Sequence, residues 1–127
     1  MTDQRFIIEM GQGADLHGRD YTKAATRAVE NALRRSSLVI LGLPGLDRSA
    51  LRVKVTVGVQ DPGTVDAATI AALLPVGRPE VVVAHGGLDV THPDTGEVIV
   101  LASAAVEAFL PPQSDRWRAI EGKGPSA

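Results

Sequence analysis

Residues 22–35 read TKAATRAVENALRR, and this stretch carries the clearest structural signal in the chain. Its apolar residues recur at helical spacing on one face, and its charged residues lie away from that face. The apolar face consists of Ala25, Ala28, Val29, Ala32 and Leu33. Just before the stretch, Asp20 is a natural N-cap, because its carboxylate can accept a hydrogen bond from a free backbone N–H group. The pattern predicts an amphipathic helix that packs on a sheet.

Strand patterns lie on both sides of this helix. Residues 5–10 (RFIIEM) form a short apolar run that predicts a first buried strand. Residues 51–60 (LRVKVTVGVQ) alternate apolar with polar or small residues, which is the period of a strand with one buried face. A second helix is expected to run to Leu74, with Thr64 or Asp66 as its cap.

Two further strands are predicted near the C-terminal end. Residues 81–84 (VVVA) are continuously apolar, which is typical of a strand that is buried on both faces. Residues 92–96 (HPDTG) predict a turn, and residues 98–102 (VIVLA) predict a fourth strand. Residues 104–110 either extend that strand or form a short helix.

This order of elements indicates an α+β fold. The first three strands are joined by helices and should be mostly parallel through right-handed crossovers, and the fourth should be antiparallel. We therefore expect a four-stranded mixed sheet with both helices on one face. Two helices cannot cover both faces of such a sheet, so we expect the chain to associate with copies of itself.

The composition limits the class of protein. With 127 residues, of which 44% are hydrophobic, we expect one domain over residues 1–110, followed by a flexible or loosely docked tail over residues 111–127 that Trp117 anchors. The net charge of -2 argues against nucleic-acid binding. The absence of cysteine excludes thiolate catalysis and is typical of a cytoplasmic protein. No apolar run reaches the length of about 18 residues that a membrane span needs.

Residues 11–20 (GQGADLHGRD) predict a loop between the first strand and the helix, which is where open α/β sheets bind ligands. Chemistry-bearing side chains gather in and after this loop, namely Asp15, His17, Arg19, Asp20, Thr22 and Lys23. Lys23 opposes the helix dipole, which favours a role other than helix stability. The loop is neither a dinucleotide-binding fingerprint nor a Walker A loop. The alternative is an irregular loop whose glycines merely permit a turn and whose Asp20 is a cap.

A second candidate is the sequence His85-Gly86-Gly87 at the end of the third strand. Consecutive glycines allow a ligand or another backbone to approach closely, although a plain turn after the strand explains them equally well. His92 lies in a turn and is expected to be exposed to solvent. A metal site could be assembled from His17, His85 and Asp15 or Asp20, but the chain lacks a local pair of ligands, so no metal is expected.

A third candidate is the polar face of the second strand. It consists of Arg52, Lys54, Thr56 and Gln60, and it is either solvated or lines a cleft in an oligomer. No G-x-S-x-G sequence is present, so a serine triad of that type is not expected. A serine activated by Lys23 would have to be one of Ser36, Ser37, Ser49 and Ser103.

Residues 6–25 (FIIEMGQGADLHGRDYTKAA) resemble the signature of the Lin0512 family of bacterial proteins. Leu74-Pro75 and the Gly86-Gly87-Leu88 sequence also match its pattern, so the resemblance spans about residue 5 to about residue 108. This family is similar in architecture to one repeat of the ring-opening amidohydrolases, the cyanuric acid amidohydrolase and barbiturase group. Those enzymes join three such units in the Toblerone fold, and single units resemble chorismate-mutase-like and YjgF-like trimers. The resemblance implies a homotrimer with clefts at its subunit boundaries.

In the amidohydrolases each unit supplies a lysine base, and a serine nucleophile precedes a Gly-Gly pair. By resemblance, the lysine is Lys23 and the pair is Gly86-Gly87, but His85 stands where the serine is expected. This departure removes the expected nucleophile. Either His85 acts as a base for water, or the unit binds a ligand without reacting.

We therefore expect a homotrimer that binds a small molecule at a cleft between subunits. The small molecule is expected to be a cyclic amide or a carboxylate, and the expected activity is hydrolase-like and acts on cyclic amides. The alternative is a non-catalytic ligand-binding or structural oligomer. The expected catalytic residues are Lys23, His85 and His17. The expected substrate-binding residues are Asp15, Arg19, Asp20, Thr22, Gly86 and Gly87. No cofactor, nucleic acid or membrane partner is expected. The two hypotheses differ in whether Lys23 faces open space or is ion-paired and buried.

Overall fold

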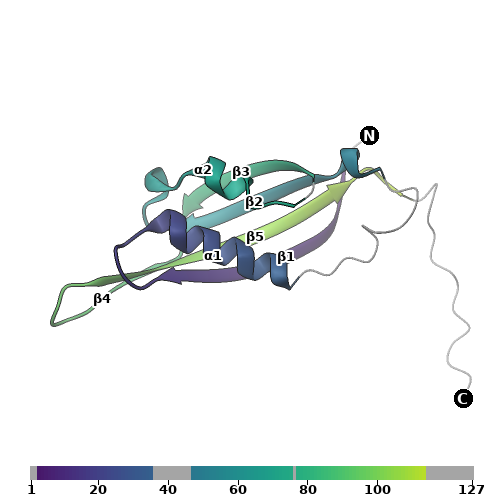
Figure 1. Cartoon of the computed structure of the whole chain (residues 1–127). Coiled ribbons are helices and arrows are strands. Elements are labelled where there is room, and N and C mark those ends of the chain that lie inside the picture. Colours follow the sequence, from purple (N-terminus) through teal and green to yellow (C-terminus); the bar gives the residue numbers. More distant parts are fainter. Residues whose placement is uncertain (1–2, 36–46, 76, 114–127) are drawn as a thin grey trace, which may run out of the picture.

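The computed structural model describes residues 3–35, 47–75 and 77–113 (Figure 1). Its strands are β1 (Gln4–Asp15), β2 (Arg52–Val59), β3 (Arg78–His85), β4 (Leu88–Thr91) and β5 (Val98–Leu110). Its helices are α1 (Tyr21–Arg34) and α2 (Ala67–Ala71), with two short 3-10 turns, η2 (Arg48–Ala50) and η3 (Pro62–Thr64). The α+β class is confirmed, with five strands in place of the expected four.

The strands form one mixed sheet in the order β1-β5-β2-β3. β5 runs antiparallel to both β1 and β2, and β2 runs parallel to β3, so the first three strands are mutually parallel as predicted. The sequence did not indicate β4, which pairs with the first residues of β5 in an antiparallel hairpin. This hairpin projects beyond the other strands (Figure 1). The alternation predicted for β2 is confirmed, since its valines are buried on the side of the helices.

Residues 11–15 belong to β1, so the loop expected to begin at Gly11 begins only after Asp15. The reason is that the glycines face α1. A Cβ at Gly13 would lie 2.3 Å from the Ala28 backbone nitrogen and 2.6 Å from the Ala24 oxygen, and a Cβ at Gly11 would lie 2.4 Å from the Ala28 oxygen. The glycines therefore let the backbone of α1 pack directly on the strand.

The core lies between α1, α2 and the sheet face that they cover, and most of its side chains are alanine and valine. Of the face predicted for α1, four residues are completely buried and Leu33 is partly buried. The buried hydrophobic residues are Tyr21, Ala24, Ala25, Ala28, Val29, Ala32, Leu51, Val53, Val55, Val57, Val59, Ile70, Val100, Ala102, Ala104, Val106, Ala108 and Leu110. Because these side chains are small, helix and sheet lie close together.

The outer parts of the sheet differ from the prediction. β3 was expected to be buried on both faces, but it is an edge strand, and Val82 is 39% exposed. α2 begins at its Asp66 cap as expected but ends at Ala71 rather than Leu74, so it covers little of β3. Residues 104–110 extend β5 and do not form a helix.

The connection expected at residues 37–46 lies outside the described residues, as do residues 114–127 with Trp117. Among the described helices, none is both long enough and apolar enough to cross a membrane.

The contact between Gly13 and α1 predicts a large loss of stability for Gly13→Ala. The added methyl group would overlap backbone atoms of α1, which cannot move as a flexible side chain does, so we expect unfolding to become easier by about 3 kcal/mol. Urea denaturation measures the change. Gly63→Ala is the control, because a Cβ there would meet nothing closer than an Asp61 side-chain oxygen at 3.8 Å. A Gly13→Ala protein as stable as the Gly63→Ala protein would contradict this account of the packing.

Candidate functional site

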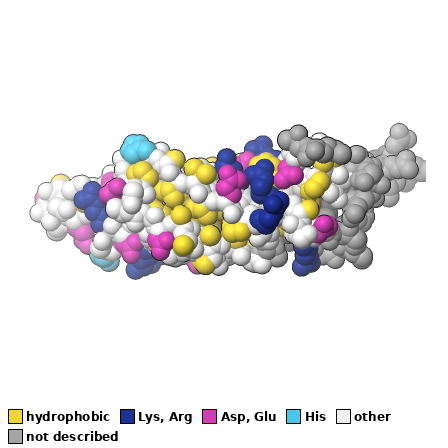
Figure 2. Space-filling model, turned by 90° about the horizontal axis from the view of Figure 1, so that it is seen from above, with side chains coloured by type: hydrophobic (Ala, Val, Ile, Leu, Met, Phe, Trp, Pro, Cys, Tyr) yellow, Lys and Arg dark blue, Asp and Glu magenta, His cyan; other side chains and the backbone are white. Residues whose placement is uncertain are grey.

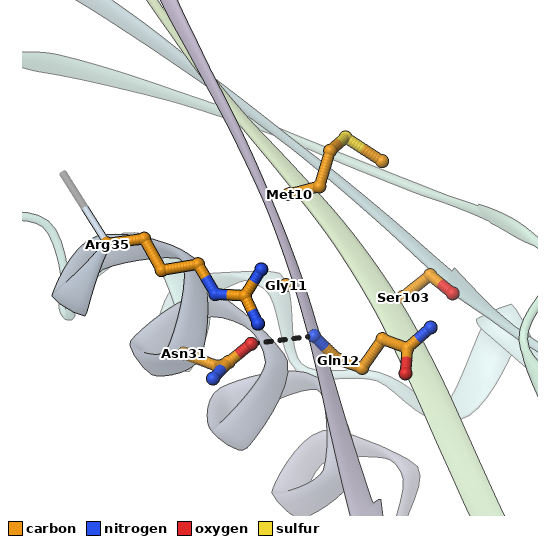
Figure 3. Close-up of a pocket in the computed structure, with 6 residues that line it drawn as sticks. All are labelled: Met10, Gly11, Gln12, Asn31, Arg35 and Ser103. Atoms are coloured by element: carbon orange, nitrogen blue, oxygen red, sulfur yellow. Dashed lines mark hydrogen bonds between the residues drawn. The ribbon is translucent and has the colours of Figure 1, made fainter.

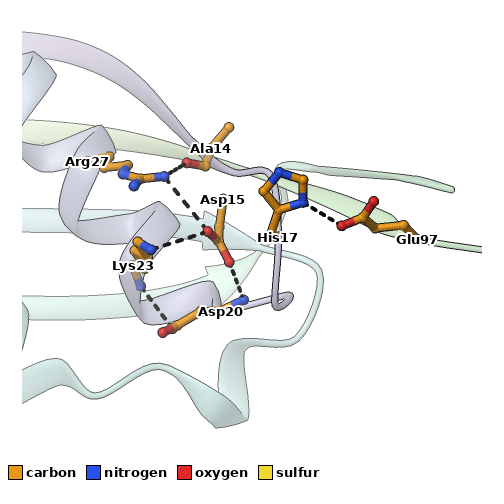
Figure 4. Close-up of polar contacts among 7 residues, drawn as sticks. All are labelled: Ala14, Asp15, His17, Asp20, Lys23, Arg27 and Glu97. Carbon is orange, nitrogen blue, oxygen red and sulfur yellow. Dashed lines mark hydrogen bonds and ion pairs between the residues drawn. The ribbon is translucent and has the colours of Figure 1, made fainter. Parts of the chain in front are cut away.

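A polar cluster surrounds Asp15 where β1 ends and α1 begins (Figure 4). The Asp15 side chain is only 3% exposed, and its Oδ2 accepts a hydrogen bond of 2.9 Å from the Asp20 backbone N–H. Its Oδ1 lies 3.8 Å from Lys23 Nζ and 3.8 Å from Arg27 Nη1. The buried carboxylate therefore holds the strand end, the connection and the helix together.

The sequence left open whether Lys23 faces open space or is ion-paired and buried, and the structure has features of both. Lys23 is ion-paired with Asp15, yet its side chain is 52% exposed. The Arg27 side chain is held by one more contact than that of Lys23. Its Nη1 also donates a hydrogen bond of 2.6 Å to the Ala14 carbonyl at the outer edge of β1.

Asp20 and Thr22 connect the first turn of α1 to its surroundings. Asp20 Oδ1 accepts a hydrogen bond of 3.0 Å from the Lys23 backbone N–H, which confirms the predicted N-cap. Thr22 Oγ1 accepts from the Asp66 N–H at 3.0 Å and donates to the Thr64 carbonyl at 3.4 Å. Thr22 therefore links the starts of the two helices.

His17 contacts the projecting hairpin. Its Nδ1 lies 2.5 Å from Glu97 Oε1, and its side chain is 81% exposed. The hydrogen bond with Glu97, followed by the charge of Glu97, raises the pKa of His17 above its ordinary value. The pair thus favours the imidazolium form, which cannot accept a proton as a base.

Arg19 lies between Tyr21 and the base of the same hairpin. Its φ is 51°, a left-handed conformation that is uncommon outside glycine. Its Nε donates to the Tyr21 hydroxyl at 3.4 Å, and its Nη2 lies 3.7 Å from Asp89 Oδ2. The Tyr21 hydroxyl donates a short hydrogen bond to the same Asp89 oxygen, and this bond raises the pKa of Tyr21. Asp89 Oδ1 is buried without a hydrogen-bond partner in the described part of the chain.

An open hollow of about 640 Å³ lies beside these residues. It is lined by Gly18, Arg19, Asp20, Tyr21, Asp61 and Thr64. Arg19 places a donor at its wall, and Asp20 and Asp61 place carboxylate acceptors there. The hollow can therefore hold a small molecule that both donates and accepts hydrogen bonds.

The Gly86-Gly87 pair lies where the chain passes from β3 to β4. The Gly86 N–H donates to the Val59 carbonyl at 2.9 Å, and the Gln60 amide donates to the Gly86 carbonyl at 2.9 Å. Gly87 has a φ of +64°, and a Cβ there would lie 2.1 Å from the Leu101 carbonyl oxygen. The two glycines therefore have a backbone role. They let the chain pass from β3, which pairs with β2, to β4, which pairs with β5.

The structure brings together only part of the expected site. Within the described ranges, no hydrogen bond or ion pair connects His85, at the exposed end of β3, with the Asp15 cluster. Ser49 binds Asp47, and Ser103 lines a different hollow. Ser36 and Ser37 lie outside the described residues. The described side chains also contain no group of three or more His, Asp or Glu that could hold a metal ion.

A family model described as a conserved hypothetical protein, Lin0512, matches residues 5–108, which is most of the chain. The chain belongs to the Lin0512 family. Its fold is similar to the crystal structure of an FtsZ-like protein of unknown function from Nostoc punctiforme PCC 73102, with a TM-score of 0.71 and 34% sequence identity. The match covers 88% of this chain and 99% of that one. The search of curated proteins found no match.

Four residues that surround the site in this Lin0512 chain were not among the sequence candidates. They are Tyr21, Asp61, Asp89 and Glu97. Tyr21 adjoins the Asp20 cap, and Asp89 follows the Gly86-Gly87 pair closely, so both stood next to recognised motifs. Glu97 gave no local signal, because only the β4–β5 hairpin brings it to His17.

The His17–Glu97 pair predicts a specific pH dependence. In Glu97→Gln, the pKa of His17 should fall toward its ordinary value of about 6.5, as observed by NMR titration of the imidazole ring. Because the pKa of His17 is raised in the folded state, the pair stabilises the fold fully at pH values below the ordinary pKa of histidine. This stabilisation is lost as the pH rises through the raised pKa. Glu30→Gln, which removes a carboxylate paired with Arg34, should leave the His17 titration unchanged. An unchanged titration in Glu97→Gln would rule out the proposed cause.

Proposed function

We propose that this protein is a homotrimer that binds a small cyclic amide in the hollow at the start of α1. The observation that carries the proposal is the mixed wall of that hollow, in which Arg19 can donate and Asp20 and Asp61 can accept hydrogen bonds. A volume of about 640 Å³ is within the range of about 300–1,000 Å³ that is usual for small-molecule sites.

The charges favour a neutral ligand over a carboxylate. Two carboxylates and one guanidinium line the hollow, so an anion would be repelled more than it is attracted. A cyclic ureide presents N–H groups to carboxylate oxygens and C=O groups to a guanidinium, and so matches this wall. The resemblance of the Lin0512 family to the ring-opening amidohydrolases agrees with this ligand class.

Several contacts favour binding without acyl-enzyme chemistry. The nucleophilic serine of the amidohydrolases is replaced by His85, which has no hydrogen bond or ion pair with Lys23 among the described residues. The Lys23 ammonium lies against the Asp15 carboxylate, and His17 is paired with Glu97. We therefore assign Lys23 and Asp15 to holding the hollow in shape, and Arg19 to contacting the ligand.

The sheet face opposite the helices supports self-association. Large apolar side chains on that face are exposed, namely Ile8, Met10, Val82, Leu88, Val90 and Ile99. Seen from above, hydrophobic side chains also reach the surface along the middle of the molecule (Figure 2). An apolar surface of this kind usually meets another protein surface. The number of three copies rests on the resemblance to the Toblerone fold.

Ligand binding is tested by calorimetric titration with hydantoin and dihydrouracil, two neutral cyclic ureides. Arg19→Asn should weaken binding about tenfold or more, because it removes a charged donor, while asparagine tolerates the left-handed backbone. Arg34→Gln, at the far end of α1, should bind as the wild type does. Equal affinity of Arg19→Asn and wild type would refute the site. Ring-opened product in the NMR spectrum of the mixture would refute binding without reaction.

Self-association is tested by light scattering after gel filtration. The wild type should have three times the chain mass of 13.3 kDa. Leu88→Asp should shift the protein to the monomer, because it places a charge on the open sheet face, where Leu88 is 54% exposed. Leu16→Asp is the control, since Leu16 is 53% exposed but lies in the connection before α1. A monomeric wild type, or equal behaviour of the two variants, would contradict the proposal.

A further inference from the structure

A second hollow lies at the free edge of β1, beside the end of α1 (Figure 3). Its volume is about 540 Å³, and it is lined by Met10, Gly11, Gln12, Asn31, Arg35 and Ser103. It shares no lining residue with the hollow at the start of α1. The two hollows therefore lie at opposite ends of the same helix.

The charge of this second hollow differs from that of the first. Among the six described residues that line it, Arg35 is the one that is ionisable, and none is acidic. The Arg35 guanidinium has no hydrogen bond or ion pair with any described side chain, whereas its neighbour Arg34 lies 3.7 Å from Glu30. Figure 3 shows the guanidinium extending from α1 toward β1. Within the described part of the chain, the hollow thus presents a positive charge without a counter-ion.

A neutral amide beside Arg35 is held in one orientation. Asn31 Oδ1 accepts a hydrogen bond of 3.2 Å from the Gln12 backbone N–H. Since only the oxygen of an amide group can accept that bond, the NH₂ group of Asn31 is left to donate elsewhere. The side chains of Gln12 and Ser103, which are partners in the β1–β5 register, add further hydrogen-bonding groups.

We propose that this hollow binds a small monocarboxylate with a short apolar chain. The carboxylate would pair with the Arg35 guanidinium, whose fork of donors matches two carboxylate oxygens, and would accept from the Asn31 NH₂ group. The apolar chain would lie against Met10, which is 55% exposed. The C-terminal end of α1 opposes an anion, but its partial charge of about -0.5 is smaller than the full charge of Arg35.

The site borders the sheet face that we propose to meet other copies, because Met10 and Ser103 lie on that face. The test of this site therefore includes the mass of each variant by light scattering, which shows whether a change in binding comes with a change in self-association. Binding of a carboxylate does not depend on binding of a cyclic amide, since the variants below leave the residues around Arg19 unchanged. Failure of one proposal is thereby distinguished from failure of the other.

The experiment is an NMR titration of the full chain with sodium butyrate at constant ionic strength. The side-chain amide signals of Asn31 and Gln12 should shift and saturate, and butyramide, which has nearly the same shape but no charge, should cause no saturable shift. Arg35→Gln should weaken butyrate binding at least tenfold, whereas Arg34→Gln should bind as the wild type does. Asn31→Asp should also abolish binding, because a carboxylate there still accepts from the Gln12 N–H but repels the ligand.

Two results would overturn the proposal. One is a wild type whose signals do not saturate with butyrate. The other is an equal loss of binding in Arg34→Gln and Arg35→Gln, which would indicate general attraction to a basic surface. A thermal melt of each variant separates loss of binding from loss of folding, and Asn31→Asp keeps the hydrogen bond to β1 for that reason.

Discussion

The direct contact between the backbones of α1 and β1 determines how the rest of the molecule is arranged. Gly11 and Gly13 have no side chains to separate the two elements, and the alanines of α1 fill the same narrow space. A helix so close to an edge strand can reach the backbone of that strand with its own side chains. Asn31 and Arg27 do this at the Gln12 N–H and the Ala14 carbonyl.

The same packing sets the positions of both hollows. α1 begins where β1 ends, so its first turn faces the connection that carries Arg19 and the buried Asp15. Its last turn lies beside the middle of β1, where Arg35 and Gln12 line the same hollow. One helix therefore carries a hollow at each end, and the described residues supply two carboxylates to the first and none to the second. This difference in charge suits the two hollows to different ligand classes.

Local patterns predicted the helix, its Asp20 cap and the alternation of β2, because each depends on residues close in sequence. At residues 11–15 the sequence predicts a loop where the structure has a strand, since glycine is typical of turns and its role against α1 depends on tertiary packing. The apolar residues of β3 suggested burial, but strand order placed them at an edge. The partners of the candidate site, Glu97 and Asp89, come from a hairpin far along the chain and left no local pattern.

The two outer edges of the sheet are not equivalent. At β1, two backbone groups that could receive another strand are already bonded to Asn31 and Arg27. At β3, Arg78 and Gly86 direct their N–H groups toward β2, so Val81 and Val83 direct theirs outward. Growth of the sheet by strand addition is therefore favoured at the β3 edge and hindered at the β1 edge. Extension at one edge only would join two copies in a closed pair rather than an open-ended filament, and the bonds from Asn31 and Arg27 to β1 favour that outcome.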